Sequence, residues 1–378
     1  MQQHQTGALL VPPADPAPWP QVAAAEAGFD AGRLDAAVAF AAANETRWQR
    51  DIAAQIISGS FEPAPDNEII GATAPRGAPN GLLLRGGRLV ARWGDTRQVD
   101  MTFSVAKSYL SILAGLAVGD GLIGDLDAPV RELVDDGGFQ GAHNGAITWR
   151  HLLQQTSEWE GTLFGKADRI DRYRALATEF AGLPGHRKGD ARPLQAPGSY
   201  WEYNDIRVNR LSLALLRVFG RALPDVFAER VMRPIGGSSR WRWEGYRNSD
   251  VGVGGQTVRS GSGGGHWGGG VFIDAEDQAR IGLLMLRDGV WGERRVLPEG
   301  WVAQSLVPCA IKPEYGLLWW LNTGRLPRPG APADSYFAIG AGGNVTWVAP
   351  ALDLVAVLRW IDVAVLDEWF AQVVRALV

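Results

Sequence analysis

The chain of 378 residues has almost none of the residues that build disulfide frameworks or zinc sites. A single cysteine, Cys309, excludes an internal disulfide, and the five histidines are scattered without the spacing of zinc ligands. They are His4, His143, His151, His186 and His266. No apolar run reaches the roughly 18 residues that a membrane span needs. We therefore expect a protein without a metal, without a cofactor and without a membrane partner.

Lysine is also scarce, since Lys and Arg total 37 but only four of these residues are lysines. The four are Lys107, Lys166, Lys188 and Lys312. Arginine stays protonated in proteins, whereas a desolvated lysine can lose its proton and act as a base. A lysine in an apolar segment of this chain is therefore a candidate for chemistry.

What the chain does contain is typical of a soluble globular protein: 46% of the residues are hydrophobic and 21% are charged. The net charge of -4 disfavours nucleic acid as a partner. Residues 1–25 form a Pro-rich arm with no basic start and only four apolar residues before the first prolines, which does not fit a secretory signal. We expect a cytoplasmic protein that acts on a small molecule, with its oligomeric state left open.

Strand patterns occur near both ends of the chain. "GLLLRGGRLVARWG" (81–94) predicts a hairpin around the turn Gly86-Gly87, and it follows a helix expected at 29–44 and opened by Asp30. Further strands are expected at 316–322, 344–350 and 352–360, before a final helix from residue 366.

The middle of the chain, 126–250, is helical and loop-rich, with helices expected at 147–157 and 208–220. Strands at both ends around a helical middle indicate an α/β (α+β) fold. We expect one α/β domain from 26–125 and 251–378, with an antiparallel sheet flanked by helices, and an inserted, mainly helical domain at 126–250.

The run "TFSVAKSYLSILAGLAVGDG" (102–121) contains the only S-x-x-K of the chain, Ser104 and Lys107. Residues three apart share one face of a helix, so the amine can reach the hydroxyl. The apolar residues that follow cover more than one face, which predicts a buried central helix ending near Gly119. The competing interpretation is a helix cap followed by a surface lysine.

Two further segments carry candidate residues. "PGSYWEYNDIRVNRLSLAL" presents Tyr203, Asn204 and Asp205 just before a helix, and a phenol near a cation can exchange protons with a serine. The alternative is a buried aromatic residue with Asn204 or Asp205 as the helix cap. In "YFAIGAGGNVTWVAP", glycines beside an apolar strand allow a substrate to lie against the strand edge, although a plain glycine-rich turn is equally compatible.

Together and in this order, the three elements resemble the motifs of the serine β-lactamase and penicillin-binding-protein superfamily. Ser104 and Lys107 match S-x-x-K, Tyr203 matches the tyrosine of Y-x-N, and 338–340 lies where the family has Lys/His-Thr-Gly. "ITWRHLLQQTS" also resembles a family segment. The resemblance covers about 90–378 and implies the β-lactamase/transpeptidase-like fold, with Ser104, Lys107 and Tyr203 as catalytic residues.

The sequence departs from the family pattern at two places. Asp205 replaces the terminal amide of Y-x-N, and "AIG" (338–340) lacks the cation that holds a β-lactam carboxylate. Nylon-oligomer hydrolases and related carboxylesterases are similar in lacking that cation. The resemblance therefore favours the class C-like esterase and amidase branch, and β-lactamase activity as the main function is disfavoured.

On this reading Ser104 attacks an ester or amide carbonyl, Lys107 and Tyr203 pass its proton to the leaving group, and the N–H groups of Ser104 and Ala341 form the oxyanion hole. We expect burial in the helix core to favour a neutral Lys107. The expected substrate-binding residues are Asp205, Trp159, Trp201, His266, Trp267, Ile339 and Gly340.

Other functions remain open at this point. "GGGHWG" (263–268) fits G-x-G-x-x-G in form but lacks the strand and helix frame of a nucleotide site, and the chain contains no G-x-S-x-G. One alternative is a catalytically idle relative that binds ligands as a sensor. Another is a weak β-lactamase or D-amino-acid peptidase.

Overall fold

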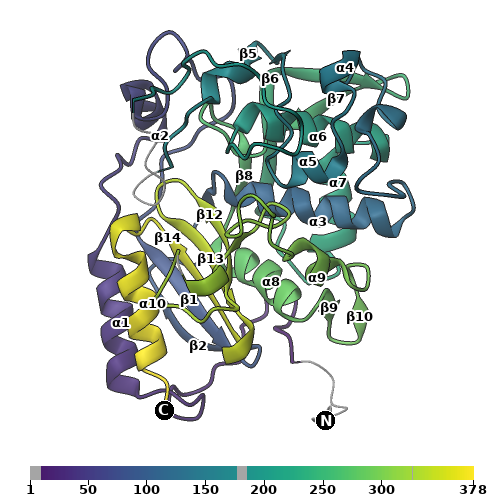
Figure 1. Ribbon diagram of the computed structural model, residues 1–378. Helices are drawn as coiled ribbons and strands as arrows, with labels where there is room; N and C mark the ends of the chain where they lie inside the picture. Colours follow the sequence, from purple (N-terminus) through teal and green to yellow (C-terminus); the bar gives the residue numbers. More distant parts are fainter. Residues whose placement is uncertain (1–9, 177–184, 326) are drawn as a thin grey trace.

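The computed structural model describes residues 10–176, 185–325 and 327–378. Its centre is a six-stranded antiparallel sheet with the strand order β11-β12-β13-β14-β1-β2 (Figure 1). The strands are β1 (Asn80–Arg85), β2 (Arg88–Trp93), β11 (Trp320–Leu321), β12 (Tyr336–Gly340), β13 (Asn344–Ala349) and β14 (Leu354–Arg359). Because β1 pairs with β14, the two ends of the chain build one sheet, as the patterns near both ends predict.

The expected hairpin is confirmed. β1 and β2 are joined by Gly86 and Gly87, whose φ angles of 60° and 75° lie in the left-handed region. Two such residues form the type I′ turn whose twist suits a two-residue hairpin.

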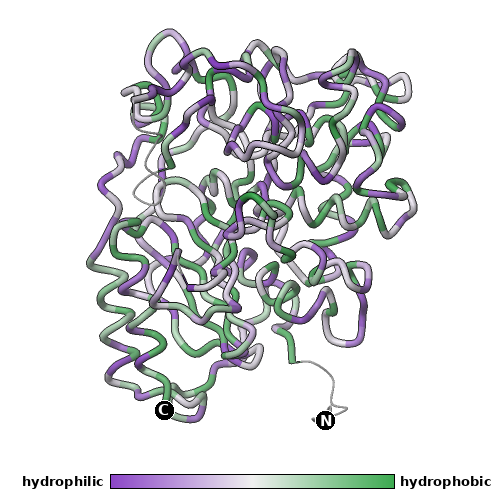
Figure 2. Tube along the Cα trace, in the orientation of Figure 1, coloured by the Kyte–Doolittle hydropathy of each residue, from purple (hydrophilic) through white to green (hydrophobic). Residues whose placement is uncertain are grey.

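Two helices cover one face of this sheet. α1 (Ala31–Ala43) begins as expected at Asp30, whose carboxylate accepts the Arg33 N–H. It packs beside α10 (Leu366–Arg375), and both helices run along the sheet (Figure 1). Hydrophilic and hydrophobic residues alternate along both helices (Figure 2). Their apolar sides meet Phe337 and Trp347 of the sheet in one core cluster. This pattern is that of helices half exposed to solvent.

The opposite face of the sheet contacts α8 (Ala275–Leu286) and α3 (Val105–Gly119). Every residue of α3 from Val105 to Ala117 is buried, since the sheet lies on one side and α6 (Asp205–Phe219) and α7 (Leu223–Phe227) lie on the other. The predicted buried central helix is confirmed, and Figure 1 shows it between the sheet and the upper part of the molecule.

A second sheet has the order β3-β8-β6-β7. Its strands are β3 (Asp100–Met101), β8 (Gly270–Ile273), β6 (Arg242–Val253) and β7 (Gln256–Gly261). The domain boundary expected between residues 250 and 251 falls inside β6.

The remaining elements are short. The helices are α2 (Ile52–Gln55), α4 (Gly141–Asn144), α5 (Trp149–Leu153) and α9 (Trp301–Ser305), and the strands are β4 (Thr162–Leu163), β5 (Lys166–Ala167), β9 (Val290–Trp291) and β10 (Arg294–Arg295). Single 3₁₀ or π turns occupy Ile56–Ser60, Val130–Glu132, Asp168–Asp171, Ala228–Met232, Thr323–Arg325, Pro350–Leu352 and Val363–Val365.

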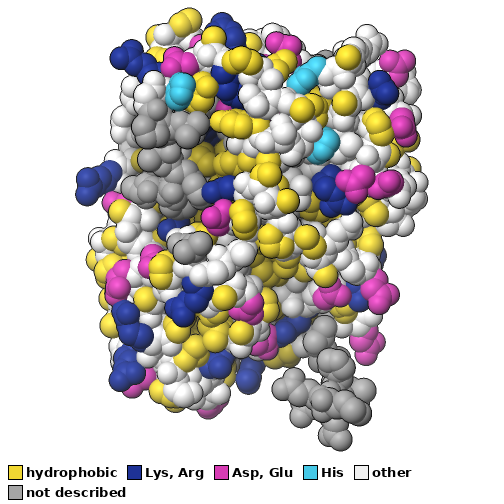
Figure 3. All heavy atoms as spheres, viewed as in Figure 1, with side chains coloured by type: hydrophobic (Ala, Val, Ile, Leu, Met, Phe, Trp, Pro, Cys, Tyr) yellow, Lys and Arg dark blue, Asp and Glu magenta, His cyan; other side chains and the backbone are white. Residues whose placement is uncertain are grey.

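Figure 3 shows hydrophobic side chains gathered across the middle of one face.

Two expected elements are much shorter than their patterns. The strand predicted at 316–322 is reduced to Trp320–Leu321, because Leu318 takes a left-handed φ of 61° and the chain turns there. The helix predicted at 147–157 ends at Leu153, since Gln155 has a φ of 60°. Left-handed conformations at non-glycine residues interrupt both regular patterns.

Among the described residues, no helix combines the length and hydrophobicity needed to cross a bilayer.

Candidate active site

Ser104 lies at the start of α3, directly after a strained residue. Phe103 has a φ of 51°, which is uncommon for a bulky side chain, and strain of this kind is often found at functional sites. The Ser104 hydroxyl makes no capping hydrogen bond to the helix. The capping role considered from the sequence is therefore not the role of this hydroxyl.

The amine of Lys107 reaches Ser104 as the spacing predicts. Lys107 Nζ donates to Ser104 Oγ at 2.8 Å, and it lies 3.3 and 3.4 Å from the carbonyl oxygens of Gly263 and Gly264. The Lys107 side chain is only 1% exposed. A buried lysine whose donors meet a serine and two carbonyls is not a surface charge.

Asp205 supplies the negative charge opposite this lysine. Its Oδ1 lies 2.7 Å from Lys107 Nζ, and its backbone N–H donates to Asp171 Oδ2 at 2.7 Å. The cap of α6 is Asn204, whose side chain accepts the Arg207 N–H, so the Asp205 carboxylate is not used as a cap. Burial by itself raises the pKa of Asp205, but Arg174 and Lys107 outweigh it and hold that pKa well below its usual range.

Tyr203 lies between two cations. Its ring centroid is 5.0 Å from Lys107 Nζ and 5.1 Å from the Arg174 guanidinium carbon. The ring also stacks on Trp320, with centroids 5.6 Å apart. The electron-rich face of an aromatic ring attracts cations. The Tyr203 ring is therefore held in position by the two cations as well as by packing.

The end of β12 presses against the start of α3. A Cβ atom on Gly340 would lie 1.9 Å from the Thr102 carbonyl oxygen and 3.2 Å from the Ser104 backbone nitrogen. Only glycine allows this approach. Ala341 follows directly, and its carbonyl accepts a hydrogen bond from Asn344 Nδ2 at 2.8 Å. The two backbone segments expected to form an oxyanion hole therefore lie side by side.

These groups open into a cleft of about 550 Å³. Of the residues predicted for the site, those on its wall are Ser104, Tyr203, His266, Ile339, Gly340 and Ala341. Apolar wall residues that the sequence did not single out are Trp48, Phe61, Leu176, Trp320 and Val363. An apolar wall with a few convergent polar groups is typical of a small-molecule site.

Three predicted pocket tryptophans lie elsewhere. Trp159 donates to the Gly138 carbonyl and Trp267 to the Asp66 carbonyl, both at 2.6 Å, and both side chains are buried in the main core. Trp201 packs behind Tyr203 at 6.2 Å between centroids. The structure brings none of the three to the described wall of the cleft, because each flanks a motif in sequence but points into packing.

A buried ionic cluster next to Asp205 was not predicted. His266 Nε2 lies 3.1 Å from Asp205 Oδ2, and His266 Nδ1 lies 2.7 Å from Glu62 Oε1. Lys188 contacts Glu62 and lies 2.9 Å from Asp171 Oδ1. The sequence analysis named Asp205 and His266 as substrate-binding residues but not their contact with Glu62 and Asp171. The scarcity of lysine was the signal that could have added Lys188.

Burial and the nearby Arg174 lower the pKa of His266, which favours the neutral imidazole. Glu62, Asp171 and His266 have ligand atoms close enough to surround a cation. The Lys188 ammonium already contacts both carboxylates, however, so a cation is part of the cluster. The donor set is therefore a poor fit for a resident metal ion.

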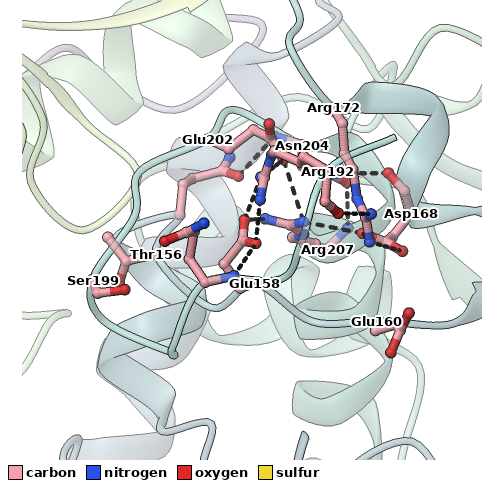
Figure 4. A network of polar contacts seen from close by, with 12 residues as sticks. Thr156, Glu158, Glu160, Asp168, Arg172, Arg192, Ser199, Glu202, Asn204 and Arg207 are labelled. Atoms are coloured by element: carbon pink, nitrogen blue, oxygen red, sulfur yellow. Dashed lines mark hydrogen bonds and ion pairs between the residues drawn. The ribbon is translucent and has the colours of Figure 1, made fainter. Parts of the chain in front are cut away.

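A second ionic network supports the segment that carries Tyr203 (Figure 4). Glu158 pairs with Arg192 at 2.6 Å and with Arg207 at 2.8 Å, and Arg192 also pairs with Glu202 at 2.9 Å. Against the effect of burial, the hydrogen bond from Arg192 and the charge of Arg207 lower the pKa of Glu158 to about 2. Burial raises the pKa of Glu202, and its arginine partners offset this only in part.

The sequence matches the model of the beta-lactamase family over residues 82–360. This span covers most of the chain and all of its motif segments. The chain belongs to the beta-lactamase family. The beta-lactamase/transpeptidase-like fold expected from the sequence is confirmed, and this family fold is shared by serine hydrolases that include esterases, amidases and β-lactamases. A search of curated protein sequences gave no match.

Solved structures show the same fold at low sequence identity. A candidate 6-aminohexanoate-dimer hydrolase from Bacillus anthracis is 16% identical with a TM-score of 0.57, over 98% of this chain and 89% of that one. A family VIII carboxylesterase is 16% identical with a TM-score of 0.55, over 86% and 96%. A penicillin-binding protein homologue from Caulobacter crescentus is 14% identical with a TM-score of 0.54, over 82% and 91%.

Proposed function

We propose that this protein is a serine hydrolase that cleaves carboxylic esters or amides through an acyl-enzyme on Ser104. The observation that carries the proposal is the 2.8 Å contact between Ser104 Oγ and the buried Lys107 Nζ at the wall of the cleft. A serine hydroxyl is a weak nucleophile until a neighbouring group takes its proton. We assign this role to Lys107, which contacts Ser104 Oγ, together with Tyr203, whose ring centroid lies 5.0 Å from Lys107 Nζ.

In the first half of the reaction, Ser104 Oγ attacks the substrate carbonyl carbon and gives up its proton to the Lys107–Tyr203 pair. The oxygen of the tetrahedral intermediate faces the N–H groups of Ser104 and Ala341, and the start of α3 contributes its positive dipole end there. The pair then gives the proton to the leaving alcohol or amine as its bond to carbon breaks.

In the second half, water attacks the acyl-enzyme carbonyl carbon. The same pair takes a proton from this water and returns one to Ser104 Oγ as the acyl group leaves as a carboxylic acid. The apolar side chains of the cleft wall, Trp48 and Phe61 among them, accommodate an uncharged part of the substrate.

Two features favour a simple ester or amide over a β-lactam. The Ala338 side chain is fully buried in the core, and Ile339 places an alkyl group on the cleft wall. Neither offers a donor to the carboxylate of a β-lactam at this strand.

The test is covalent labelling with a fluorophosphonate, together with the release of p-nitrophenol from p-nitrophenyl butyrate. We expect one adduct per chain, located on the peptide that contains Ser104, and a burst of product. Ser111→Ala is the matched control, because Ser111 is a buried serine on the same helix whose hydroxyl has no hydrogen-bond partner among the described residues. Labelling of Ser111→Ala should equal that of wild type. Absence of labelling, burst and turnover in a folded protein would leave the idle, ligand-binding alternative.

A further inference from the structure

Arg174 lies on the wall of a cleft that is also lined by Ile339, a residue of the segment where the family supplies a cation from its third motif. Its side chain is only 10% exposed, so it is not a solvated surface arginine. It comes from the inserted segment before α6, whereas Ala338 and Ile339 come from β12 of the main sheet. A cation is therefore present in the cleft, but on another element.

Only part of the Arg174 guanidinium is engaged. Its ion pairs, 3.2 Å to Asp205 Oδ1 and 3.7 Å to Asp171 Oδ2, both run through Nη1. Among the described residues, Nη1 makes these ion pairs without a hydrogen bond, and Nε and Nη2 make neither an ion pair nor a hydrogen bond. A guanidinium fork with two nitrogens available can hold a planar carboxylate with two parallel hydrogen bonds.

The charges around Arg174 place cations toward the cleft and anions behind them. Asp171, Asp205 and Glu62 have side chains that are at most 2% exposed, while Arg174 and Lys188 are on the cleft wall. With Lys107 included, three cations balance these three carboxylates. The cleft wall also holds the pair of Arg47 and Asp362, whose opposite charges offset each other, so Arg174 and Lys188 give the wall its excess positive charge.

The position of Arg174 also indicates which part of the substrate it meets. Its guanidinium carbon lies 5.1 Å from the ring centroid of Tyr203, and Tyr203 belongs to the pair to which we assign the return of the proton to the leaving group. We propose that Arg174 forms an anion-binding subsite, and that the preferred substrates are esters or amides whose leaving group carries a carboxylate. This inference rests on the proposed hydrolase function and narrows its substrate class.

The experiment compares two acetate esters of equal shape, 3-acetoxybenzoate and the uncharged 3-acetoxybenzamide. One charge-assisted hydrogen bond corresponds to about tenfold or more in affinity, so kcat/KM for the anionic ester should exceed that for the amide by at least about tenfold. Arg174→Gln should bring this ratio close to one. Arg174→Lys keeps the charge but loses the planar guanidinium. Its ratio should lie between that of wild type and that of Arg174→Gln.

Arg259→Gln is the matched control, since Arg259 is half exposed, pairs with Asp250 and does not line the cleft. It should keep the wild-type ratio. Arg174→Gln also removes a partner of Asp205, so binding is measured separately from catalysis. Isothermal titration calorimetry with the products, 3-hydroxybenzoate and 3-hydroxybenzamide, gives their dissociation constants.

Equal turnover of the two esters by wild type, with equal product affinities, would overturn the anion subsite and leave the hydrolase proposal intact. A wild-type preference for the anion that persists in Arg174→Gln would also overturn it. If neither ester is hydrolysed, the hydrolase proposal fails. The substrate preference rests on that proposal and fails with it, whatever the affinities for the two products.

Discussion

Lys107 Nζ lies 2.7 Å from Asp205 Oδ1, and both side chains are almost completely buried. The sequence analysis expected burial to favour the neutral amine. The structure instead gives Lys107 a buried carboxylate partner, because Asp205 stands where the family pattern has an amide. Lys107 thus contacts a buried carboxylate as well as Ser104, and the proton of Ser104 must move within a buried cluster of ionisable side chains.

Ser104→Ala should abolish ester hydrolysis while the protein keeps its fold. The hydroxyl caps nothing, so its removal should change the melting temperature little. Losing the nucleophile removes the reaction path itself. Steady-state hydrolysis and thermal unfolding of the same preparation check this, and activity above a small fraction of wild type would rule out Ser104 as the nucleophile.

Lys107→Arg should lower kcat/KM by at least the range that general acid–base assistance supplies, about 10²–10⁴-fold. Arginine keeps the charge, but it does not give up its proton and its fork does not fit between Ser104 and Asp205. Lys312→Arg is the control, because Lys312 pairs with Glu314 outside the cleft wall. An active Lys107→Arg enzyme would mean that this lysine supplies charge alone.

Asp205→Asn should restore the family's amide but destabilise this protein. It leaves Lys107 and Arg174 with one buried carboxylate fewer, and removing one partner of a buried pair typically costs about 3–5 kcal/mol. Asp250→Asn breaks the exposed pair with Arg259 and should leave the unfolding transition unchanged. Urea unfolding of both variants measures the difference, and equal stability would contradict the role assigned to the ion pair.

Gly340→Ala should lower both stability and activity. The new Cβ would overlap the Thr102 carbonyl oxygen, so β12 has to move away from the start of α3 and Ala341 moves with it. At Gly124 the same change meets no atom within 4 Å, and that variant is the control. We expect kcat to fall by a larger factor than KM changes, because the oxyanion contact forms during the reaction. Unchanged kinetics would show that this strand end is not part of the site.

Glu158→Gln should destabilise the protein more at pH 7 than at pH 3. The pKa of Glu158 is lowered to about 2 from a usual value of about 4.3, so its ionised form stabilises the fold above the usual value. That contribution is lost as the pH falls toward 2. Glu160→Gln, an exposed neighbour, is the control. Unfolding measured at both pH values checks the sign, and a gap that widens at low pH would contradict it.

The sequence by itself determined the local parts of this site. The three-residue spacing of Ser104 and Lys107 brings them together on any helix, and the glycines at 86 and 87 fix the hairpin turn. Gly340 also follows from the motif, because a close backbone approach excludes a side chain. The apolar residues around Ser104 predicted a buried helix, and α3 is buried.

Only the tertiary structure decided the electrostatics and the pocket. Glu62, Asp171, Lys188 and His266 lie far apart in the chain, and no periodicity relates them, yet folding brings them around Asp205. The tryptophans show the same limit. Trp320 lies on the cleft wall and Trp267 lies in the core, but the sequence alone does not distinguish them. The difference depends on which neighbours the fold packs against each ring.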